Sequence, residues 1–221
     1  MNSTAQYERY PINLTKFKTD NYIPKDHFRI PLRWDNFTMH VPLWHQVLNH
    51  FFSKDKNLRF LELGSGNGLC ANFLLDNYSC HVDTIDLSDS HVWDEDGEKY
   101  IVSTSANLKP FVDESRCKFY QMSTKEFLLK NQDKSYDFIY VDASHDKDWV
   151  LFDAVNSFSI LKEGGLMIFD DYGWGDCKIP IDSFLNCYEE HIEVFYKEWQ
   201  VMIRKLSCLE NQYEKRTKKD D

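Results

Sequence analysis

The sequence predicts an α/β domain with a mostly parallel seven-stranded sheet, helices on both faces and an antiparallel strand at one edge. Three observations support this prediction. Short apolar segments with the length of buried strands alternate with segments of helical periodicity. A glycine-rich turn joins the first of these strands to the helix that follows it. The last two strands follow each other without a helix between them, which allows an antiparallel edge.

The chain of 221 residues has a length that suits one domain, and it divides into three segments. Residues 1–40 contain three prolines and no regular periodicity, so we expect an irregular N-terminal arm or lid. Residues 41–207 are expected to form the domain itself. Residues 208–221 are rich in charged side chains, and we expect a solvated C-terminal tail.

Each element of the domain is predicted from its own pattern. Apolar residues at helical spacing follow Pro42, which suits a first helical turn, and predict a helix over residues 43–52. The expected strands cover residues 59–63, 81–87, 117–121, 136–142, 166–170, 193–197 and 200–205. The expected later helices cover residues 69–77, 98–109, 125–131, 149–161 and 181–191.

Charge and cysteine content limit the partners and the location of the protein. The formal net charge of −10 would repel a phosphate backbone, so nucleic acid is not an expected partner. No apolar stretch reaches the ~18 residues that a membrane span needs, so a membrane partner is not expected either. The six cysteines form no CxxC pair, and we interpret them as reduced and the protein as cytoplasmic. The sequence leaves both a disulfide and a homo-oligomer open.

A glycine-rich motif lies between the strand over residues 59–63 and the helix over residues 69–77. Glycines let the backbone turn tightly and let a ligand approach closely, and the start of a helix offers N–H groups to a polar ligand. The strand–loop–helix context is typical of a Rossmann-like cofactor loop. The residues expected to contact the cofactor here are Glu62, Gly64, Ser65, Gly66 and Gly68.

The spacing of the glycines distinguishes between two classes of cofactor. A dinucleotide motif GxGxxG that starts at Gly64 would need a glycine where the sequence has Leu69. The form present, acid-x-Gly-x-Gly-x-Gly, resembles the first motif of class I S-adenosylmethionine (SAM)-dependent methyltransferases. In that family the acid, here Glu62, lies near the methionine end of SAM. The expected cofactor is therefore SAM.

An acid and a short loop further along the chain fit the same cofactor. Asp86 ends the next strand, where it can accept hydrogen bonds from both ribose hydroxyls of SAM. The alternative is a turn aspartate that caps the backbone before Ser88. After the third strand, the resemblance places Met122 and Ser123 beside the adenine, although Met122 suits a core position equally well.

Three carboxylates follow two strands that we expect to be central and parallel. Asp142 ends the strand over residues 136–142, and Asp170 and Asp171 lie at the end of the strand over residues 166–170. Because ligands bind at the carboxyl ends of strands in open α/β sheets, these acids should face one crevice. Their mutual repulsion favours a bound cation, and Mg²⁺ or a similar divalent cation prefers oxygen ligands. The alternative is that each aspartate caps a helix or a turn.

The segment from residue 136 to residue 174 resembles a family of small-molecule O-methyltransferases, and the similarity covers residues 58–190. This family includes the sugar O-methyltransferases of macrolide pathways and, more distantly, the catechol type. The resemblance implies that Asp142, Asp170 and Asp171 bind the metal ion. Because Asp142 should also border the reacting groups, we count it among the catalytic and the cofactor-binding residues.

The sequence departs from that family's pattern at the residue expected to remove the proton. The catechol type has a lysine three residues after the first metal ligand, where this sequence has His145. The sugar enzymes can use an acid one residue earlier, where this sequence has Ser144. Histidine can accept a hydroxyl proton, so His145 is the expected general base. Its alternative role is that of a loop residue that caps the following helix.

Together these patterns predict a SAM-dependent methyltransferase that methylates a hydroxyl group of a small molecule, such as a sugar diol or a catechol, with the help of a divalent cation. Two alternatives stay open, a metal-independent methyltransferase acting on nitrogen or another acceptor, and a SAM-binding protein without catalysis. A nucleotide-binding oxidoreductase is disfavoured because the sequence has Leu69 where a glycine would be needed.

Overall fold

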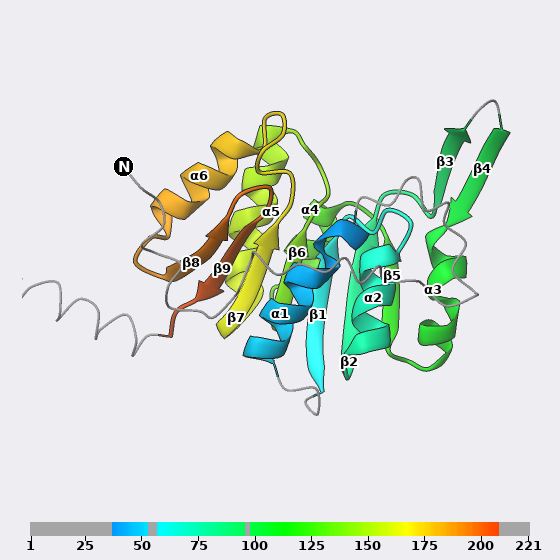
Figure 1. Cartoon of the computed structure of the whole chain (residues 1–221), viewed down its shortest axis with the longest axis horizontal. Coiled ribbons are helices and arrows are strands. Elements are labelled where there is room, and N and C mark those ends of the chain that lie inside the picture. The colour runs from blue at the N-terminus through cyan, green and yellow to red at the C-terminus, as the bar shows by residue number, and fades with distance from the viewer. Residues whose placement is uncertain (1–36, 53–56, 96–97, 208–221) are drawn as a thin grey trace, which may run out of the picture. The chain divides into compact units, whose positions relative to one another are not determined.

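The computed structural model describes residues 37–52, 57–95 and 98–207 (Figure 1). The predicted tail over residues 208–221 lies outside the described residues, and so does the predicted arm apart from residues 37–40. Those four residues include a short 3₁₀ helix, η3 (Thr38–His40).

Seven strands form one sheet in the order β5-β2-β1-β6-β7-β9-β8, and β3 and β4 form a separate two-stranded sheet. The strands are β1 (Leu58–Leu63), β2 (Cys80–Asp86), β3 (Ser90–Glu95), β4 (Glu98–Ser103), β5 (Cys117–Gln121), β6 (Tyr136–Val141), β7 (Leu161–Phe169), β8 (Ile192–Lys197) and β9 (Val201–Lys205). The helices are α1 (Val41–Phe51), α2 (Leu69–Asn77), α3 (Thr104–Asp113), α4 (Thr124–Lys130), α5 (Lys147–Ile160) and α6 (Lys178–Cys187).

The directions of the strands confirm the predicted mostly parallel sheet. The pairs β2/β5, β1/β6 and β6/β7 are parallel, whereas β9 pairs antiparallel with both β7 and β8. The seven strands of the sheet are the seven predicted from the sequence. Contacts divide the chain into two compact units, residues 1–58 with 65–122, and residues 59–64 with 123–221.

In the first unit, aromatic side chains join α1 to α2. Trp44 is fully buried on α1, with its ring 6.4 Å from that of Phe73 on α2. Phe37 packs against both rings, at 5.0 Å from Trp44 and 5.4 Å from Phe73. All residues of α2 from Leu69 to Leu75 are buried, which explains why this helix is apolar around most of its circumference.

The predicted helix over residues 98–109 is wrong in its first half. Residues 98–103 form β4, which pairs antiparallel with β3 from Ser90↔Ser103 to Glu95↔Glu98. The helix α3 begins only at Thr104 because the side chain of Ser103 accepts a hydrogen bond from the N–H of Ala106 and caps the helix. The β-branched pair Ile101 and Val102 suits a strand, and the capping serine was the signal for the later helix start.

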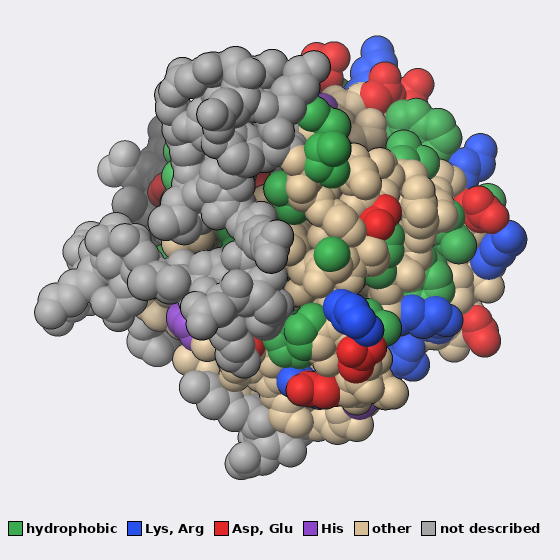
Figure 2. All heavy atoms as spheres, turned by 90° about the vertical axis from the view of Figure 1, so that its right-hand side faces the viewer, with side chains coloured by type: hydrophobic (Ala, Val, Ile, Leu, Met, Phe, Trp, Pro, Cys, Tyr) green, Lys and Arg blue, Asp and Glu red, His purple; other side chains and the backbone are tan. Residues whose placement is uncertain are grey.

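Charged side chains of both signs are interspersed on the face of the first unit that bears α3 (Figure 2). Lys109 pairs with Asp113 one helical turn later at 2.9 Å. Arg116 lies 3.5 Å from Glu114 and also donates to the carbonyls of Leu75 and Tyr78. Exposed pairs of this kind contribute little to stability, so this face is held mainly by its buried apolar side chains.

In the second unit, β6 and β7 are the buried centre. Phe138 and Ile139 of β6 and residues 166–169 of β7 are 0% exposed, as expected for parallel strands covered on both sides. Residues 162–165, which separate the expected helix over residues 149–161 from the expected strand over residues 166–170, lie within β7, where the register shifts between Tyr136↔Leu161 and Phe138↔Leu166. The helix α5 packs on both strands and also contacts α4 and α6.

Two further expectations concern membranes and thiols. None of the helices among the described residues is long and apolar enough to cross a membrane. The five described cysteines that carry free thiols are Cys70, Cys80, Cys117, Cys177 and Cys187.

One buried acid in the second unit is a source of instability at neutral pH. Asp153 on α5 is 1% exposed, and its Oδ2 accepts a hydrogen bond from Thr124 Oγ1 at 3.1 Å. Its Oδ1 and the hydroxyl of Ser157 have no hydrogen-bond partner among the described residues. Burial raises the pKa of Asp153 to about 6, only partly opposed by the hydrogen bond from Thr124. The protein therefore holds a buried carboxylate that is charged above pH 6.

We expect Asp153→Asn to raise the free energy of unfolding at pH 8 and to change it little at pH 4. The neutral amide avoids burying a charge, and the difference between a folded pKa of about 6 and the ordinary 3.8 corresponds to at most on the order of 3 kcal/mol. The folded pKa is raised, so the destabilisation is absent below the unfolded pKa and complete above the folded one. Urea unfolding at both pH values measures this, with exposed Asp133→Asn as the control. An equal effect at both pH values would contradict the assignment.

Candidate active site

The end of β1 lies directly against the end of β6 in the second unit. Gly64, the residue after β1, has φ +92°, and a Cβ placed on it would lie 1.8 Å from the carbonyl oxygen of Asp142. The N–H of Asp142 donates to the carbonyl of Leu63 at 2.9 Å, so the backbones hold each other at this distance. Only glycine fits here, for both its conformation and its lack of a side chain.

The rest of the glycine loop belongs to the first unit and is anchored to the end of β2. Ser65 donates its N–H to the carbonyl of Ile85 at 3.0 Å, and its hydroxyl shares a 2.5 Å hydrogen bond with that of Thr84. Gly66 has φ +49°, and a Cβ on it would meet no atom of the described residues within 4 Å. The loop backbone is therefore fixed on one side and open at Gly66, where a ligand could approach.

Two side chains of α3 hold the carbonyl groups of this loop. Thr104 Oγ1 donates to the carbonyl of Gly66 at 2.6 Å, and Asn107 Nδ2 donates to the carbonyl of Asn67 at 2.9 Å. Both side chains are buried, and they lie three residues apart on one face of the helix. Neither residue is predicted as a site residue from the sequence, because both fall inside the longer helix expected over residues 98–109.

Within the first unit, the side chain of Asp86 supports the glycine loop by accepting backbone hydrogen bonds. Its Oδ2 accepts the N–H of Gly66 at 2.9 Å, and its Oδ1 accepts the N–H of Ser88 at 3.2 Å. The contact to Ser88 is the turn interaction considered from the sequence. Each carboxylate oxygen retains a second acceptor position, so this support is compatible with further hydrogen bonds to a ribose.

Met122 and Ser123 follow β5 and differ in their roles. The N–H of Met122 donates to the carbonyl of Asp86 at 2.9 Å, and its side chain is half-buried. In the second unit, Ser123 caps α4, because its hydroxyl accepts the N–H of Glu126 at 3.1 Å. A helix cap explains the serine without a cofactor.

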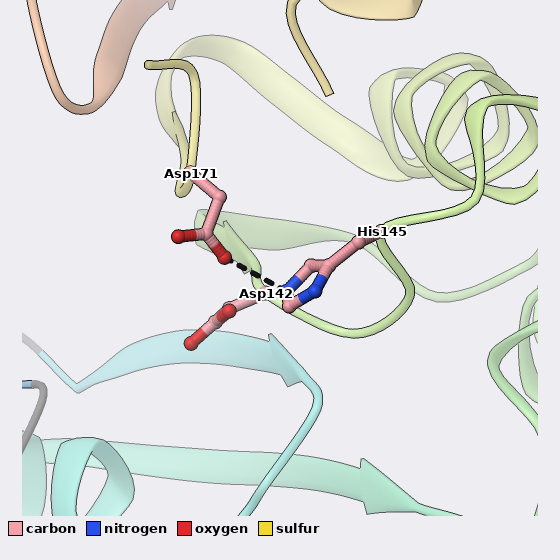
Figure 3. A group of neighbouring side chains, drawn as sticks. All are labelled: Asp142, His145 and Asp171. Atoms are coloured by element: carbon pink, nitrogen blue, oxygen red, sulfur yellow. Dashed lines mark ion pairs between the residues drawn. The ribbon is translucent and has the colours of Figure 1, made fainter. Parts of the chain in front are cut away.

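Side chains from the loops after β6 and β7 turn toward one another in the second unit (Figure 3). Asp142, His145 and Asp171 each present one potential ligand atom, and these atoms all lie within 4.8 Å of one another. His145 Nε2 is 2.8 Å from Asp171 Oδ2. Asp146 caps α5 through the N–H of Asp148, so the loop between Asp142 and the helix is short and holds His145 close.

Asp170 lies beside this group but is engaged by buried partners. Tyr140, 2% exposed, donates its hydroxyl to Asp170 Oδ2 at 2.6 Å and lies 3.2 Å from Asp142 Oδ2. Gln200, 0% exposed, donates to Asp170 Oδ1 at 3.1 Å. Neither Tyr140 nor Gln200 is predicted as a site residue from the sequence. Tyr140 occupies an apolar strand pattern, and Gln200 reaches the site only through the pairing of β9 with β7.

Burial and, after it, repulsion between carboxylates dominate the electrostatics of the site. Burial raises the pKa of Asp142 well above its ordinary range, and the negative charges of Asp170 and Asp171 raise it further. The hydrogen bond from Tyr140 opposes this rise, whereas the buried acid Glu62 adds to it. A cation placed near these groups would relieve the repulsion and favour the charged form of Asp142.

A pocket of about 250 Å³, including its opening to solvent, lies over these groups. Its polar wall includes Asp142, Ser144, His145, Asp170 and Asp171, and its apolar wall consists of Val141, Val150, Phe169, Cys177 and Ile181. The thiol of Cys177 is buried, and burial followed by the neighbouring carboxylates raises its pKa to about 11. The thiol is therefore neutral and belongs to the apolar wall.

Asp171 and His145 are held by their surroundings. Asp171 has φ +54°, an uncommon conformation for a residue other than glycine, which aspartate tolerates better than most. The ring of His145 meets the edge of Trp174 at 4.7 Å, and 45% of the His145 side chain is exposed. The imidazole thus lies between a carboxylate and an indole at the opening of the pocket.

Comparison with known proteins identifies the family. A family model described as a methyltransferase domain matches residues 61–172, about half of the chain. A search of curated proteins finds no match. The MycE methyltransferase from the mycinamycin biosynthetic pathway, in complex with Mg and SAH, superposes with a TM-score of 0.56 at 17% identity, over 79% of this chain and 52% of that chain. This chain therefore spans about half the length of MycE.

Two other solved structures share the fold. An O-methyltransferase from Bacillus cereus in complex with SAH has a TM-score of 0.58 at 13% identity, over 78% of this chain and 83% of that chain. The ribosomal protein L11 methylase from Lactobacillus delbrueckii subsp. bulgaricus has a TM-score of 0.51 at 18% identity, over 78% and 81%. At these identities the similarity establishes the fold, and it includes proteins with different acceptors.

We expect Gly64→Ala to destabilise the protein by more than about 3 kcal/mol, because a Cβ would overlap the carbonyl of Asp142 in addition to the cost of a positive φ. Gly164→Ala is the matched control. Gly164 has φ +75° but open space around its Cβ position, so it should lose only about 1–2 kcal/mol. Urea unfolding, or soluble yield where a variant does not fold, gives the comparison. Equal losses of stability in the two variants would show that the positive φ of Gly64, without the close approach to Asp142, accounts for the glycine.

Proposed function

The chain belongs to the methyltransferase-domain family of SAM-dependent enzymes, and from this premise we propose that it methylates a hydroxyl oxygen of a small molecule with the help of a divalent cation. The observation that supports this best is the group formed by Asp142, His145 and Asp171, whose ligand atoms lie within 4.8 Å of one another. Carboxylates that hold a cation and a histidine that accepts a proton are what deprotonation of a hydroxyl group requires.

In this proposal SAM is held by the residues of the glycine motif and the acids near it. Within the first unit, the open position at Gly66 and the carboxylate of Asp86 suit a ligand with ribose hydroxyls. Within the second unit, Glu62 is a 1% exposed acid beside the narrow turn at Gly64, which suits a positively charged ligand group. The proposed SAM-binding residues are Glu62, Gly64, Ser65, Gly66, Gly68, Asp86, Met122, Ser123 and Asp142.

The acids after β6 and β7 fit a divalent cation by their chemistry. Asp142 and Asp171 offer oxygen atoms in one group, and the raised pKa of Asp142 reflects repulsion that a cation would relieve. Asp170 completes the proposed set of metal ligands, with its oxygens already oriented by Tyr140 and Gln200. A divalent cation bound here would lower the pKa of an acceptor hydroxyl.

The residues of the chain then have separate tasks. Asp142 would border the acceptor oxygen, and His145 would take the proton that this oxygen loses when it receives the methyl group, with S-adenosylhomocysteine as the leaving group. Asp171 Oδ2 lies 2.8 Å from His145 Nε2 and would fix the orientation of the imidazole ring. Alignment of the acceptor oxygen with the methyl group is the main contribution of such a site, since the methyl group of SAM is already activated.

The acceptor that suits these groups has neighbouring oxygens, as in a sugar diol or a catechol. MycE was solved with Mg, SAH and mycinamycin VI, which supports a small-molecule acceptor. A cytoplasmic location and the absence of nucleic-acid and membrane partners stay predictions from the sequence, and a homo-oligomer stays open.

We expect the protein to transfer a labelled methyl group from SAM to a neutral catechol or a sugar diol in the presence of Mg²⁺, and to lose at least about 100-fold in rate with a chelator, since the hydroxyl would stay protonated. Asp171→Asn should weaken Mn²⁺ binding, measured by electron paramagnetic resonance, whereas exposed Asp176→Asn should not. Transfer that resists the chelator would indicate a metal-independent enzyme. SAM binding without transfer to any acceptor would indicate a non-catalytic protein.

We expect His145→Ala to lower the turnover number by about 10²- to 10⁴-fold, the usual contribution of a positioned proton acceptor. The affinity for SAM, measured by calorimetry, and the affinity for Mn²⁺ should stay within about twofold, because a base binds neither. His191→Ala, an exposed histidine before β8, is the control. A native rate in His145→Ala would remove the base assignment. A large loss of Mn²⁺ affinity would instead make His145 a metal ligand.

A further inference from the structure

Two tryptophans of the second unit are exposed near the segment that follows β7. Trp174 follows β7 and is 57% exposed, and Trp199 lies between β8 and β9 and is 65% exposed. Indole rings are large and apolar, so leaving two of them in contact with water is unfavourable unless a ligand covers them. The mechanism proposed above assigns neither residue a role.

Contacts with the site hold Trp174 in place. Its ring meets the ring of His145 at 4.7 Å and an interplanar angle of 75°. The backbone N–H of Trp174 donates to the carbonyl of Asp171 at 2.9 Å, and the backbone N–H of Cys177, which lines the pocket, donates to the carbonyl of Trp174 at 3.4 Å. The backbone of Trp174 is therefore fixed beside Asp171 and Cys177, while its indole touches His145.

Trp199, in the turn between β8 and β9, packs against the segment that follows β7. Its carbonyl accepts the N–H of Tyr172 at 3.0 Å, and the turn is closed by the N–H of Glu198 donating to the carbonyl of Gln200 at 3.0 Å. Its ring lies on Gly173, where a Cβ would be 3.0 Å from the ring atom Cε3 and 3.2 Å from Cζ3. Gly173 thus leaves room for the indole, directly before Trp174 in the sequence.

We propose that Trp174 and Trp199 form a binding platform for the ring of the methyl acceptor. This inference rests on the proposed function and adds a recognition element to it. A sugar ring and an aromatic ring share an apolar face, and either can pack on indole, which also offers its N–H at the edge. The continuity from Trp174 through His145 to the pocket places such a ring beside the group that would accept the hydroxyl proton.

A third exposed tryptophan provides a control within the same unit. Trp149 on α5 is 42% exposed, but it packs against Phe152 at 6.1 Å, and the ammonium group of Lys125 lies 5.5 Å from its ring centre. Replacing Trp149 removes an exposed indole of the same size without changing the platform.

The test uses the full chain with two neutral probes, methyl 3,4-dihydroxybenzoate and methyl α-rhamnopyranoside. Binding is measured by ligand-observed NMR without turnover, and KM and kcat are measured where transfer occurs. We expect Trp174→Ala and Trp199→Ala each to weaken binding of at least one probe about 3- to 10-fold, the size of one aromatic contact, with SAM affinity unchanged. Trp174→Phe and Trp199→Phe should retain most of the binding, and Trp149→Ala all of it.

Gly173→Ala offers a second, independent measurement, because its Cβ would displace the Trp199 ring without removing it. Because the ring would have to shift by only a few tenths of an ångström, this variant should weaken probe binding, but less than Trp199→Ala does. A preference for one probe identifies the ring class and supports the platform. Probe binding equal to wild type in both alanine variants overturns it, and a change in oligomeric state with unchanged probe binding assigns the indoles to a protein interface instead. Lost binding in a protein that transfers no methyl group would sustain the platform while contradicting the proposed function.

Discussion

Repulsion among carboxylates at the ends of β6 and β7 is the constraint on which the site depends. Parallel pairing from Phe138↔Leu166 to Val141↔Phe169 brings Asp142 and Asp170 to the same edge, and the turn after β7 adds Asp171. Like charges at this separation are unfavourable unless hydrogen bonds or a cation compensate them. The surrounding residues are arranged accordingly. Tyr140 and Gln200 donate hydrogen bonds to Asp170, and His145 lies within ion-pair distance of Asp171.

The sequence predicts the central sheet well because its strands are buried on both sides. Continuous apolar runs such as residues 138–141 and 166–169 are typical of parallel strands covered on both sides, and they have the length of a strand and not of a helix. The hairpin of β3 and β4 was not predicted, because a two-stranded sheet has no continuous buried face and therefore no such pattern. Val92 and Ile101 are paired in register yet 61% and 73% exposed, so periodicity could not identify them as strand residues.

The candidate site was predictable where it depends on strand ends and unpredictable where it depends on distant pairing. Asp142, His145 and Asp171 come together because two neighbouring strands end there. Gln200 becomes a partner of Asp170 only because β9 returns antiparallel beside β7, which spacing along the chain does not indicate. Thr104 and Asn107 hold the glycine loop from a helix 40 residues later, again without a local signal.

The fold alone does not determine the acceptor, since the structural neighbours include a ribosomal protein methylase as well as enzymes in complex with small molecules. Differences between such enzymes must lie in the segments that follow the strands. In the second unit these segments contain a histidine where a lysine occurs in the catechol type, and exposed indoles at Trp174 and Trp199. The strands thus fix the acids in place, whereas the short segments after β6, β7 and β8 contain the proposed proton acceptor and the apolar surface that we propose selects the substrate.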